Sequence, residues 1–526
     1  MVHDKLDLLI GQLFIFGFRG LEVDETISAF YRRYPVGGLI LFGRNLKNRD
    51  QVKRLTKGLE DLARTVSPNN QLLIAIDQEG GSLSPLRGLV TSLPGNMGLA
   101  ASGDPSAAYY AGMITGKELA QLGFNLNFAP VLDLALEQNP VVGTRAFSDC
   151  VETVTCFGKE FALGLNVGGV LYTAKHFPGH GSCTEDSHLT LPSCREPLSI
   201  LQNRDLIPFK TFIKLPGASV MMAHVKYEQM DPSCPASMSP VVIGFLRKEL
   251  GFEGVIITDC LEMKAIQEFI PYPRDAVKAI EAGVDLVLIS HTPEHQAASF
   301  QAVKEAVLEG KISLKRIEDS VSRINRWKSL LGQKAQLSEP VTDWTPVKLA
   351  EKAVTLVDPK QSWEFNTQPL TLITPELSQI TQAENLGEIN VLAEALAGSG
   401  VPCQRINCSN NPSEAEISRI IAAQNRSGNR KIAFLLSNPE SSPGQVQLIN
   451  LLAKTNRLIL ICSRNPKEVL KVGADLPVIF TYSTEASVFT ALARVLAGKA
   501  VPGGRLPLAW PQFGGREGRY SCKALC

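Results

Sequence analysis

Residues 169–188 read GVLYTAKHFPGHGSCTEDSH. The apolar residues 169–174 predict a buried strand, and Pro178, Gly179 and Gly181 prevent a helix from following directly. The polar residues after the strand are therefore expected on a loop at its carboxyl end. In folds built from parallel strands, active sites form at that end.

The loop is rich in histidine. Asp186 and His188 are two positions apart, so in an extended segment their side chains share a face and the carboxylate can hydrogen-bond the imidazole. A carboxylate partner fixes the tautomer and stabilises the imidazolium, which suits the ring to transfer protons near neutral pH. The alternative reading is a solvated polar loop. For His180, a further alternative is a residue that only shapes the loop.

Seven other apolar runs resemble 169–176 and alternate with helical patterns, which is typical of βα units and a parallel sheet. Eight such runs predict a (β/α)8 TIM-type barrel. The runs are 13–18, 38–42, 72–77, 125–130, 169–176, 219–224, 255–259 and 285–290. Several end in or beside a polar residue, and a barrel gathers such ends on one rim.

The chain has 526 residues, more than one hydrophobic core usually organises, so two domains are expected. A helical pattern over 313–331 ends at Gly332, which predicts a barrel domain over 1–335. Residues 336–349 lack periodicity and are expected to be a linker. Residues 350–526 predict a smaller, open α/β sandwich domain. Its apolar runs are 370–374, 431–436, 457–462 and 478–482, between helical patterns such as 413–424 and 485–498.

Composition argues for a substrate that is neutral or small. The net charge is +1, so neither nucleic acid nor an anionic membrane is an expected partner. The 11 cysteines follow no disulfide framework, which favours a reducing compartment. The apolar run 8–18 is shorter than the roughly 20 residues that span a bilayer and lacks the flanks of a signal peptide. A cytoplasmic location is therefore expected.

The loop motif Lys-His-Phe-Pro-Gly-His-Gly, followed after four residues by Asp-Ser-His, resembles the signature of the bacterial β-N-acetylglucosaminidases of glycoside hydrolase family 3. Other fragments resemble the same family in the same order. They are Gly37–Asn45, Asp77–Gly81, Asn139–Phe147, Arg204–Phe209, Ile257–Met263 and, near the end of the chain, Gly503–Pro507.

The resemblance implies an exo-acting, retaining enzyme for terminal β-linked N-acetylglucosamine, without metal or cofactor, acting on cell-wall muropeptides. A retaining glycosidase needs a nucleophile about 5–5.5 Å from an acid. The resemblance implies that Asp259 is the nucleophile and that His188, oriented by Asp186, is the acid and base. Without it, Asp259 reads equally as a helix-capping aspartate.

The resemblance also implies a set of residues that hold the sugar hydroxyls, namely Asp77, Arg145, Lys175 and His176. The alternative for Arg145 is a surface arginine. His224 closes the sixth predicted barrel strand and is expected to line the same pocket, with a buried structural histidine as the other reading. The oligomeric state is not indicated.

Two positions depart from the family pattern. Pro85 stands where the family usually has an arginine, and Arg87 is the candidate replacement if the loop bulges. Cys260 stands where an acidic residue commonly follows the nucleophile, and it is expected to be a small buried residue.

Other functions remain open at this stage. A metal hydrolase would use His176, His180, Asp186 and His188 as ligands, although the first predicted strand lacks the His-x-His typical of amidohydrolase barrels. A non-catalytic sugar-binding protein would keep the fold without the reaction. A β-glucosidase differs only in the acetamido pocket. A glycoside phosphorylase is conceivable because His188, unlike a carboxylate, need not repel phosphate.

Overall fold

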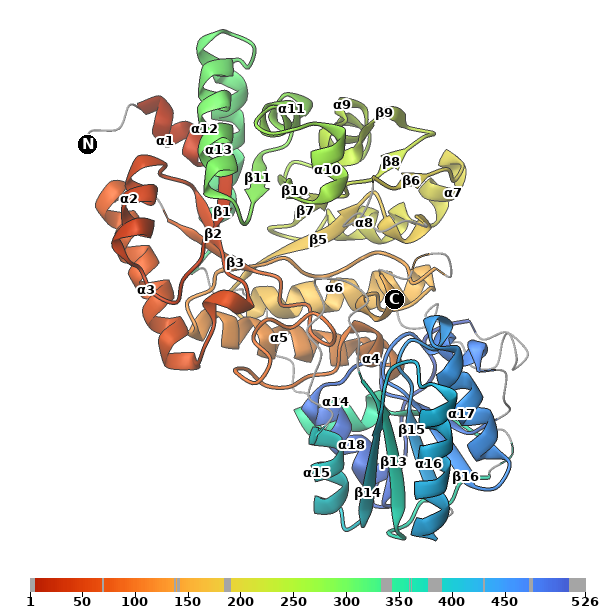
Figure 1. The fold of residues 1–526 in the computed structure, drawn as a ribbon. Coiled ribbons are helices and arrows are strands. Elements are labelled where there is room, and N and C mark those ends of the chain that lie inside the picture. The colour runs from red at the N-terminus through yellow and green to blue at the C-terminus, as the bar shows by residue number, and fades with distance from the viewer. Residues whose placement is uncertain are drawn as a thin grey trace.

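The computed structural model describes residues 5–509 apart from 69–70, 137–138, 140–141, 184–190, 333–342, 359, 361, 377–389, 429–430 and 473–475. The chain forms a barrel from its first part and a separate open sheet from its last part, and the open sheet lies against one side of the barrel (Figure 1). No helix among these residues has both the length and the apolar composition needed to cross a bilayer.

The barrel is closed by eight parallel strands in the order β1-β11-β10-β7-β5-β4-β3-β2. Each of the eight predicted apolar runs coincides with one of them, with β5 and β10 ending one residue beyond their runs, which confirms the (β/α)8 barrel. The strands are β1 Phe14–Gly17, β2 Gly38–Ile40, β3 Leu73–Ile76, β4 Leu126–Asn127, β5 Leu171–Phe177, β7 Ser219–Met222, β10 Val255–Cys260 and β11 Leu286–Ile289.

Helices surround the barrel (Figure 1). They are α1 Lys5–Gly11, α2 Glu25–Arg33, α3 Arg49–Val66, α4 Asn96–Ala101, α5 Pro105–Gln121, α6 Val151–Val167, α7 Leu198–Asn203, α8 Leu206–Phe212, α9 Pro240–Gly244, α10 Lys264–Phe269, α11 Arg274–Ala282, α12 Pro293–Leu308 and α13 Leu314–Lys328. A small sheet of β6 Ser193–Cys194, β8 Lys226–Tyr227 and β9 Asp231–Pro235 lies beside the barrel.

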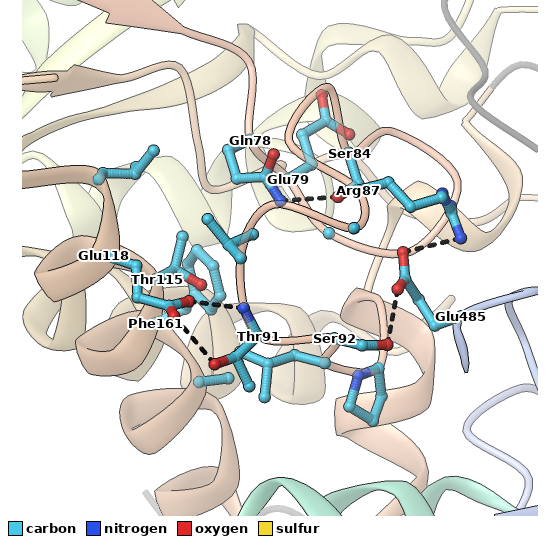
Figure 2. A pocket seen from close by; sticks show the side chains of 17 residues that line it. Gln78, Glu79, Ser84, Arg87, Thr91, Ser92, Thr115, Glu118, Phe161 and Glu485 are labelled. Atoms are coloured by element: carbon cyan, nitrogen blue, oxygen red, sulfur yellow. Dashed lines mark hydrogen bonds and ion pairs between the residues drawn. The ribbon is translucent and has the colours of Figure 1, made fainter. Parts of the chain in front are cut away.

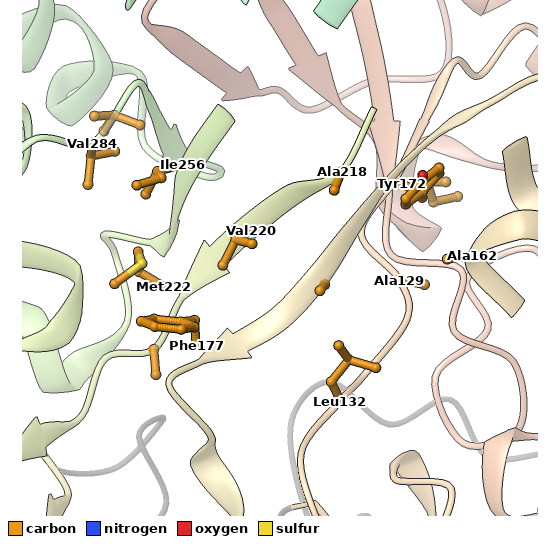
Figure 3. Close-up of a cluster of buried hydrophobic side chains, with 14 of the residues drawn as sticks. Ala129, Leu132, Ala162, Tyr172, Phe177, Ala218, Val220, Met222, Ile256 and Val284 are labelled. Atoms are coloured by element: carbon orange, nitrogen blue, oxygen red, sulfur yellow. The ribbon is translucent and has the colours of Figure 1, made fainter. Parts of the chain in front are cut away.

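Alternation along each strand separates two apolar layers. In β10, Val255 and Ile257 belong to the layer inside the barrel, whereas Ile256 belongs to the layer between the barrel and its helices. Figure 3 shows part of the outer layer, with Tyr172 of β5 and Val220 of β7 among its side chains. Burial on both faces explains why these strands are short, continuous apolar runs in the sequence.

The second sheet has the order β12-β17-β16-β15-β13-β14, with β12 antiparallel to β17 and the other pairs parallel. Helices flank it, which confirms the open α/β architecture. The elements are α14 Pro346–Ala353, β12 Thr355–Val357, β13 Leu370–Pro375, α15 Asn390–Gly398, β14 Cys403–Cys408, α16 Glu414–Ser427, β15 Lys431–Leu435, α17 Pro443–Ala453, β16 Arg457–Cys462, β17 Val478–Phe480 and α18 Ala486–Leu496.

The two parts share a hydrophobic contact. Met97 and Ala101 of α4 belong to the same buried cluster as Phe434, Phe480 and other residues of the second sheet. The backbone amide of Arg505 also donates to the carbonyl of Ala101 at 2.8 Å. An apolar interface of this kind holds two domains in a defined orientation.

The domain boundaries at 335 and 350 stay a prediction. The last barrel helix, α13, ends at Lys328, and residues 333–342 lie outside the described residues. The first helix of the second part, α14, begins at Pro346, inside the predicted linker, because Thr345 caps it by accepting a hydrogen bond from the Lys348 amide.

Helices α5 and α6 pack against each other through glycines. A Cβ atom at Gly164 would lie 2.2 Å from the carbonyl oxygen of Tyr109 and 2.7 Å from the amide nitrogen of Met113. We expect Gly164→Ala to lower the free energy of unfolding by about 2 kcal/mol, because neither backbone can move aside cheaply. Urea unfolding measures the change. Gly244→Ala in α9 is the control, since no described atom outside its chain neighbours and its own helix backbone lies within 4 Å of its Cβ position, and an equal loss there would contradict the packing argument.

Candidate active site

The polar side chains at the carboxyl ends of the barrel strands meet on one rim. Lys175 and His176 lie in the last half of β5, Asp77 directly follows β3, and Asp259 lies near the end of β10. These are the strand ends at which the sequence predicted a site. The rim positions the residues because parallel strands in a closed barrel end at the same face.

Lys175 links two carboxylates. Its Nζ lies 2.7 Å from Asp77 Oδ1 and 2.6 Å from Glu79 Oε1. Arg145, which ends the short helix Gly143–Arg145, holds Glu79 from the other side, with Nε 2.9 Å from Oε2 and Nη2 2.8 Å from Oε1. The reading of Arg145 as a surface arginine is therefore wrong, since only 10% of its side chain is exposed.

The network separates one buried carboxylate from one accessible carboxylate. The side chain of Glu79 is 1% exposed and that of Lys175 is 3% exposed, whereas Asp77 is 24% exposed. Burial works to raise the pKa of Glu79, but Arg145 and Lys175 outweigh it and lower that pKa to about 2. Burial raises the pKa of Asp77 even though Lys175 acts in the opposite direction. Glu79 therefore anchors the cations, and Asp77 faces the open side of the rim.

His176 is oriented by Asp133. The Asp133 carboxylate accepts hydrogen bonds from the His176 amide at 3.2 Å and the His180 amide at 2.7 Å, and its Oδ2 lies 2.7 Å from His176 Nδ1. Burial opposes ionisation, but His176 and His180 hold the pKa of Asp133 below its usual value. An ionised carboxylate only accepts, so His176 Nδ1 carries a proton. The other ring nitrogen, Nε2, lies 3.8 Å from Asp259 Oδ2.

The Asp259 carboxylate is both ionised and accessible from the open side of the rim. Its Oδ1 accepts a hydrogen bond from the Cys260 amide at 2.7 Å, and its side chain is 22% exposed. Burial works to raise the pKa of Asp259, but His176, His224 and the Cys260 amide outweigh it and hold the pKa below its usual value. An ionised carboxylate on an open rim suits a nucleophile.

His224 contacts the backbone next to Asp259. Its Nδ1 is 2.8 Å from the Ser237 hydroxyl, and its Nε2 is 3.0 Å from the Cys260 carbonyl oxygen. Burial lowers the pKa of His224. With both ring nitrogens bonded to the protein, His224 orients the Asp259–Cys260 backbone, as its reading as a structural histidine predicts. Its contact with the sugar stays a prediction.

His180 packs in the core of the loop. Asn139 Nδ2 lies 3.1 Å from its Nδ1 and 2.7 Å from its carbonyl oxygen. Burial lowers the pKa of His180 to about 4. This arrangement fits a neutral ring that shapes the backbone.

The depressed pKa of His180 has a consequence for stability. As the pH falls below 6.5, His180 becomes protonated in the unfolded chain, whereas in the folded chain it stays neutral down to about pH 4. The free energy of unfolding should therefore decrease as the pH falls from 6.5 to 4 and should not decrease further through His180 below pH 4. His180→Asn retains an acceptor for Asn139 but does not titrate. The decrease in the free energy of unfolding between pH 6.5 and 4 should therefore be smaller in the variant by up to about 3 kcal/mol, since one pKa unit corresponds to 1.36 kcal/mol. Urea unfolding from pH 7.5 to 3.5 tests this. Parallel curves for the parent and the variant would contradict it.

Asp186 and His188, the predicted acid and base pair, lie outside the described residues. Arg87, the candidate replacement for the arginine missing at Pro85, forms an ion pair with Glu485 of the second domain at 3.0 Å. In this structure Arg87 is thus directed toward the second domain.

Of the metal ligands in the rival reading, His176 and His180 are described, and both are hydrogen-bonded to protein groups. A different group, Cys260, Glu262 and His291, has ligand atoms within 4.8 Å of one another. Glu262 accepts hydrogen bonds from the amides of Ser290, His291 and Thr292, and Arg44 Nη1 lies 3.0 Å from His291 Nδ1. The guanidinium already supplies the positive charge there, so the group reads as structural.

Sequence reasoning missed Glu79 and Asp133 as site residues. Glu79 belongs to a fragment that carried the family resemblance, and Asp133 follows the fourth barrel run by three residues. The available signal was charge balance. A buried lysine, arginine or histidine on a rim requires a carboxylate beside it.

A closed parallel barrel with ionised and hydrogen-bonding side chains gathered at the carboxyl ends of its strands defines the class of (β/α)8-barrel enzymes. The model of the glycosyl hydrolase family 3 N terminal domain matches residues 5–327. The chain therefore belongs to glycosyl hydrolase family 3, as the loop motif predicted.

Named relatives agree with this assignment. The chain is 33% identical over 389 residues to beta-hexosaminidase A of Pseudoalteromonas piscicida, covering 68% of this chain and 64% of that protein. It is 40% identical over 296 residues to beta-hexosaminidase of Alkalilimnicola ehrlichii, covering 55% of this chain and 82% of the relative. The chain thus spans less than two thirds of the length of the Pseudoalteromonas protein.

A solved structure matches nearly the whole chain. It is the glycoside hydrolase family 3 beta-N-acetylglucosaminidase from Paenibacillus sp. str. FPU-7, with a TM-score of 0.88 and 36% identity, covering 96% of this chain and 99% of that one. The fold of both the barrel and the open sheet is therefore shared with a beta-N-acetylglucosaminidase.

Proposed function

We propose that this protein is a retaining exo-β-N-acetylglucosaminidase that releases terminal β-linked N-acetylglucosamine through a covalent glycosyl-Asp259 intermediate. The observation that carries the proposal is the Asp259 carboxylate, which is held ionised at the open end of β10 with Oδ1 fixed by the Cys260 amide. The names of the similar proteins supply the sugar. Retention follows from the assignment of a carboxylate nucleophile.

The first step joins Asp259 Oδ2 to the anomeric carbon and breaks the bond between that carbon and the leaving oxygen. His188, oriented by Asp186, gives a proton to the leaving oxygen and then removes one from the water that cleaves the intermediate. This assignment rests on the sequence motif. His176 Nε2 lies 3.8 Å from Asp259 Oδ2, which is too long for a hydrogen bond, so His176 acts on the nucleophile electrostatically.

Asp77, Lys175, Arg145 and His176 bind the sugar in this proposal. Asp77 is more exposed than Lys175, its partner in the ion pair. Asp77 is therefore the group that reaches the sugar hydroxyls, and Lys175 holds the Asp77 carboxylate in place. Arg145 contributes through Glu79, which connects it to Lys175. Ring orientation is thereby set by groups that do not move during the reaction.

The natural substrates we propose are cell-wall muropeptides in the cytoplasm. This part rests on the sequence resemblance and on the cysteine pattern. Release of N-acetylglucosamine from a purified disaccharide muropeptide tests the substrate. Fractionation of cells tests the location.

The main experiment compares nitrophenyl β-N-acetylglucosaminide with nitrophenyl β-glucoside and then traps the enzyme with 5-fluoro-N-acetylglucosaminyl fluoride. We expect preference for the N-acetyl substrate and a peptide containing Asp259 that is heavier by one fluorosugar, because fluoride leaves as the ester forms. A fluorosugar attached to another residue contradicts the assignment of Asp259 as the nucleophile. Preference for the glucoside contradicts N-acetylglucosamine as the substrate sugar. Formation of a sugar 1-phosphate in phosphate buffer identifies a phosphorylase.

A further inference from the structure

The segment between β3 and α4, residues 77–95, carries both Asp77 and Glu79 and lies between the barrel and the second domain. We refer to it as the β3–α4 loop. Its tail is tied to the barrel, because the Thr91 amide and hydroxyl donate to Glu118 of α5 at 2.8 and 3.0 Å. Arg87 in its middle and Ser92, the residue after Thr91, contact Glu485 of the second domain (Figure 2).

We propose that Glu485 of the second domain is a positioning residue for this loop, acting through Arg87 and Ser92, and so sets the affinity of the barrel for its sugar. The affinity part rests on the proposed function, whereas the positioning part does not. The established contacts of Asp77 and Glu79 with Lys175 and Arg145 remain within the barrel, so Glu485 adds a contribution from outside it.

Glu485 occupies the N-cap position of α18, yet its side chain makes no capping hydrogen bond. The side chain instead crosses to the barrel, where it lies 3.0 Å from Arg87 Nη1 and accepts a hydrogen bond from the Ser92 hydroxyl at 2.8 Å. The Ser487 amide donates to the same hydroxyl at 3.1 Å. Glu485 is almost completely buried. A buried carboxylate that leaves its own helix end uncapped has a stronger partner elsewhere.

Arg87 connects Glu485 to the part of the β3–α4 loop that carries the site residues Asp77 and Glu79. Its Nη2 donates to the carbonyl oxygen of Gly81 at 2.5 Å, two residues after Glu79. Gly81 has φ +61°, and a Cβ there would lie 2.7 Å from the Cα of Gly95, so the backbone is tightly confined. The guanidinium therefore joins the second domain to a backbone position adjacent to the Glu79 anchor.

The loop is stiff enough to transmit a displacement. The Gln78 side chain donates to Ser84 Oγ at 2.8 Å (Figure 2). It also accepts a hydrogen bond from the Leu86 amide at 3.2 Å. The Glu79 amide donates to the Leu83 carbonyl at 3.1 Å. Movement of Arg87 is thus carried to Gln78 and Glu79 through short hydrogen bonds.

The cavity next to these residues does not bind the sugar itself. Glu79, Arg87, Ser92 and Glu485 line a space of ≈ 20 Å³, which holds about one water. Glu485 therefore acts on the sugar through the loop and not by contact.

Glu485→Gln tests the proposal, because it removes the charge and keeps the shape. Asp149→Asn is the matched control. Asp149 Oδ2 accepts from the Ala509 amide at 2.9 Å, which is another contact between the barrel and the last part of the chain, outside the β3–α4 loop. The first readout is hydrogen exchange of the backbone amides in 79–87, which all these residues except Pro85 possess, and this readout needs no sugar. The second is the dissociation constant of N-acetylglucosamine together with KM and kcat.

We expect Glu485→Gln to speed exchange of these amides, to weaken N-acetylglucosamine binding and raise KM about tenfold, and to change kcat by less than about threefold, since a displaced loop binds ground state and transition state alike less well. Asp149→Asn should match the parent. In Arg87→Met, the further change Glu485→Gln should add little, because the two act in series.

Unchanged exchange in Glu485→Gln, or equal effects in Asp149→Asn, overturns the proposal. Faster exchange with unchanged sugar affinity overturns the link between the loop and binding. A parent protein that neither binds nor cleaves the sugar overturns the proposed function instead, and the exchange result then decides the positioning role by itself.

Discussion

Asp259→Asn should lower kcat on nitrophenyl β-N-acetylglucosaminide by at least about 10³-fold, because the amide cannot form the glycosyl ester. The carboxylate is held below its usual pKa by His176, His224 and the Cys260 amide despite its burial. Those three groups are arranged to stabilise a negative charge. Single-turnover and steady-state kinetics measure the loss, and a melting temperature near that of the parent shows that the fold is intact.

A second variant separates a nucleophile from a residue that only maintains the site. Asp259→Ala opens space where the side chain is 22% exposed, so azide can enter. Azide then attacks the anomeric carbon, nitrophenolate leaves without needing an acid, and the product should be the α-glycosyl azide. Activity restored by azide with the β-azide as product, or full activity in Asp259→Asn, would show that another group is the nucleophile.

The barrel could be predicted because its strands are buried on both faces. Such strands are continuous apolar runs, and all eight appear in the sequence. The two strands of the second sheet that were not predicted, β12 and β14, are its edges. In β14, residues such as Gln404, Arg405 and Asn407 interrupt the apolar pattern because an edge strand is partly solvated.

The site was predictable to the extent that strand ends determine it. Asp77, Lys175 and Asp259 stand at such ends, and the barrel brings them to one rim. Partner choice was not predictable, since it depends on how loops from different strands pack. Nothing in the sequence pairs Asp133 with His176, or Arg87 with a carboxylate in the other domain. The acid and base pair still rests on its motif alone.

Glu79→Gln should destabilise the protein more than any exposed charge substitution, by about 3–5 kcal/mol, because it removes the carboxylate that contacts both Lys175 and Arg145. At present Glu79 balances both cations, with oxygen to nitrogen distances of 2.6, 2.8 and 2.9 Å. The glutamine retains the shape and one acceptor but not the charge. Urea unfolding at pH 7 measures the difference.

The control is Glu60→Gln, which breaks the exposed pair between Glu60 and Arg64 at 3.7 Å and should cost less than about 1 kcal/mol. The pH dependence supplies an independent check. The Glu79 pKa is about 2 in the folded protein against 4.5 in the unfolded chain, so its contribution is complete above pH 4.5 and disappears as the pH falls toward 2. The difference in the free energy of unfolding between the parent and Glu79→Gln should therefore become smaller as the pH falls from 4.5 toward 2. A constant difference, or a loss at pH 7 no larger than that of Glu60→Gln, would mean that Lys175 and Arg145 do not depend on the Glu79 charge and that the other carboxylates of the site keep them in place.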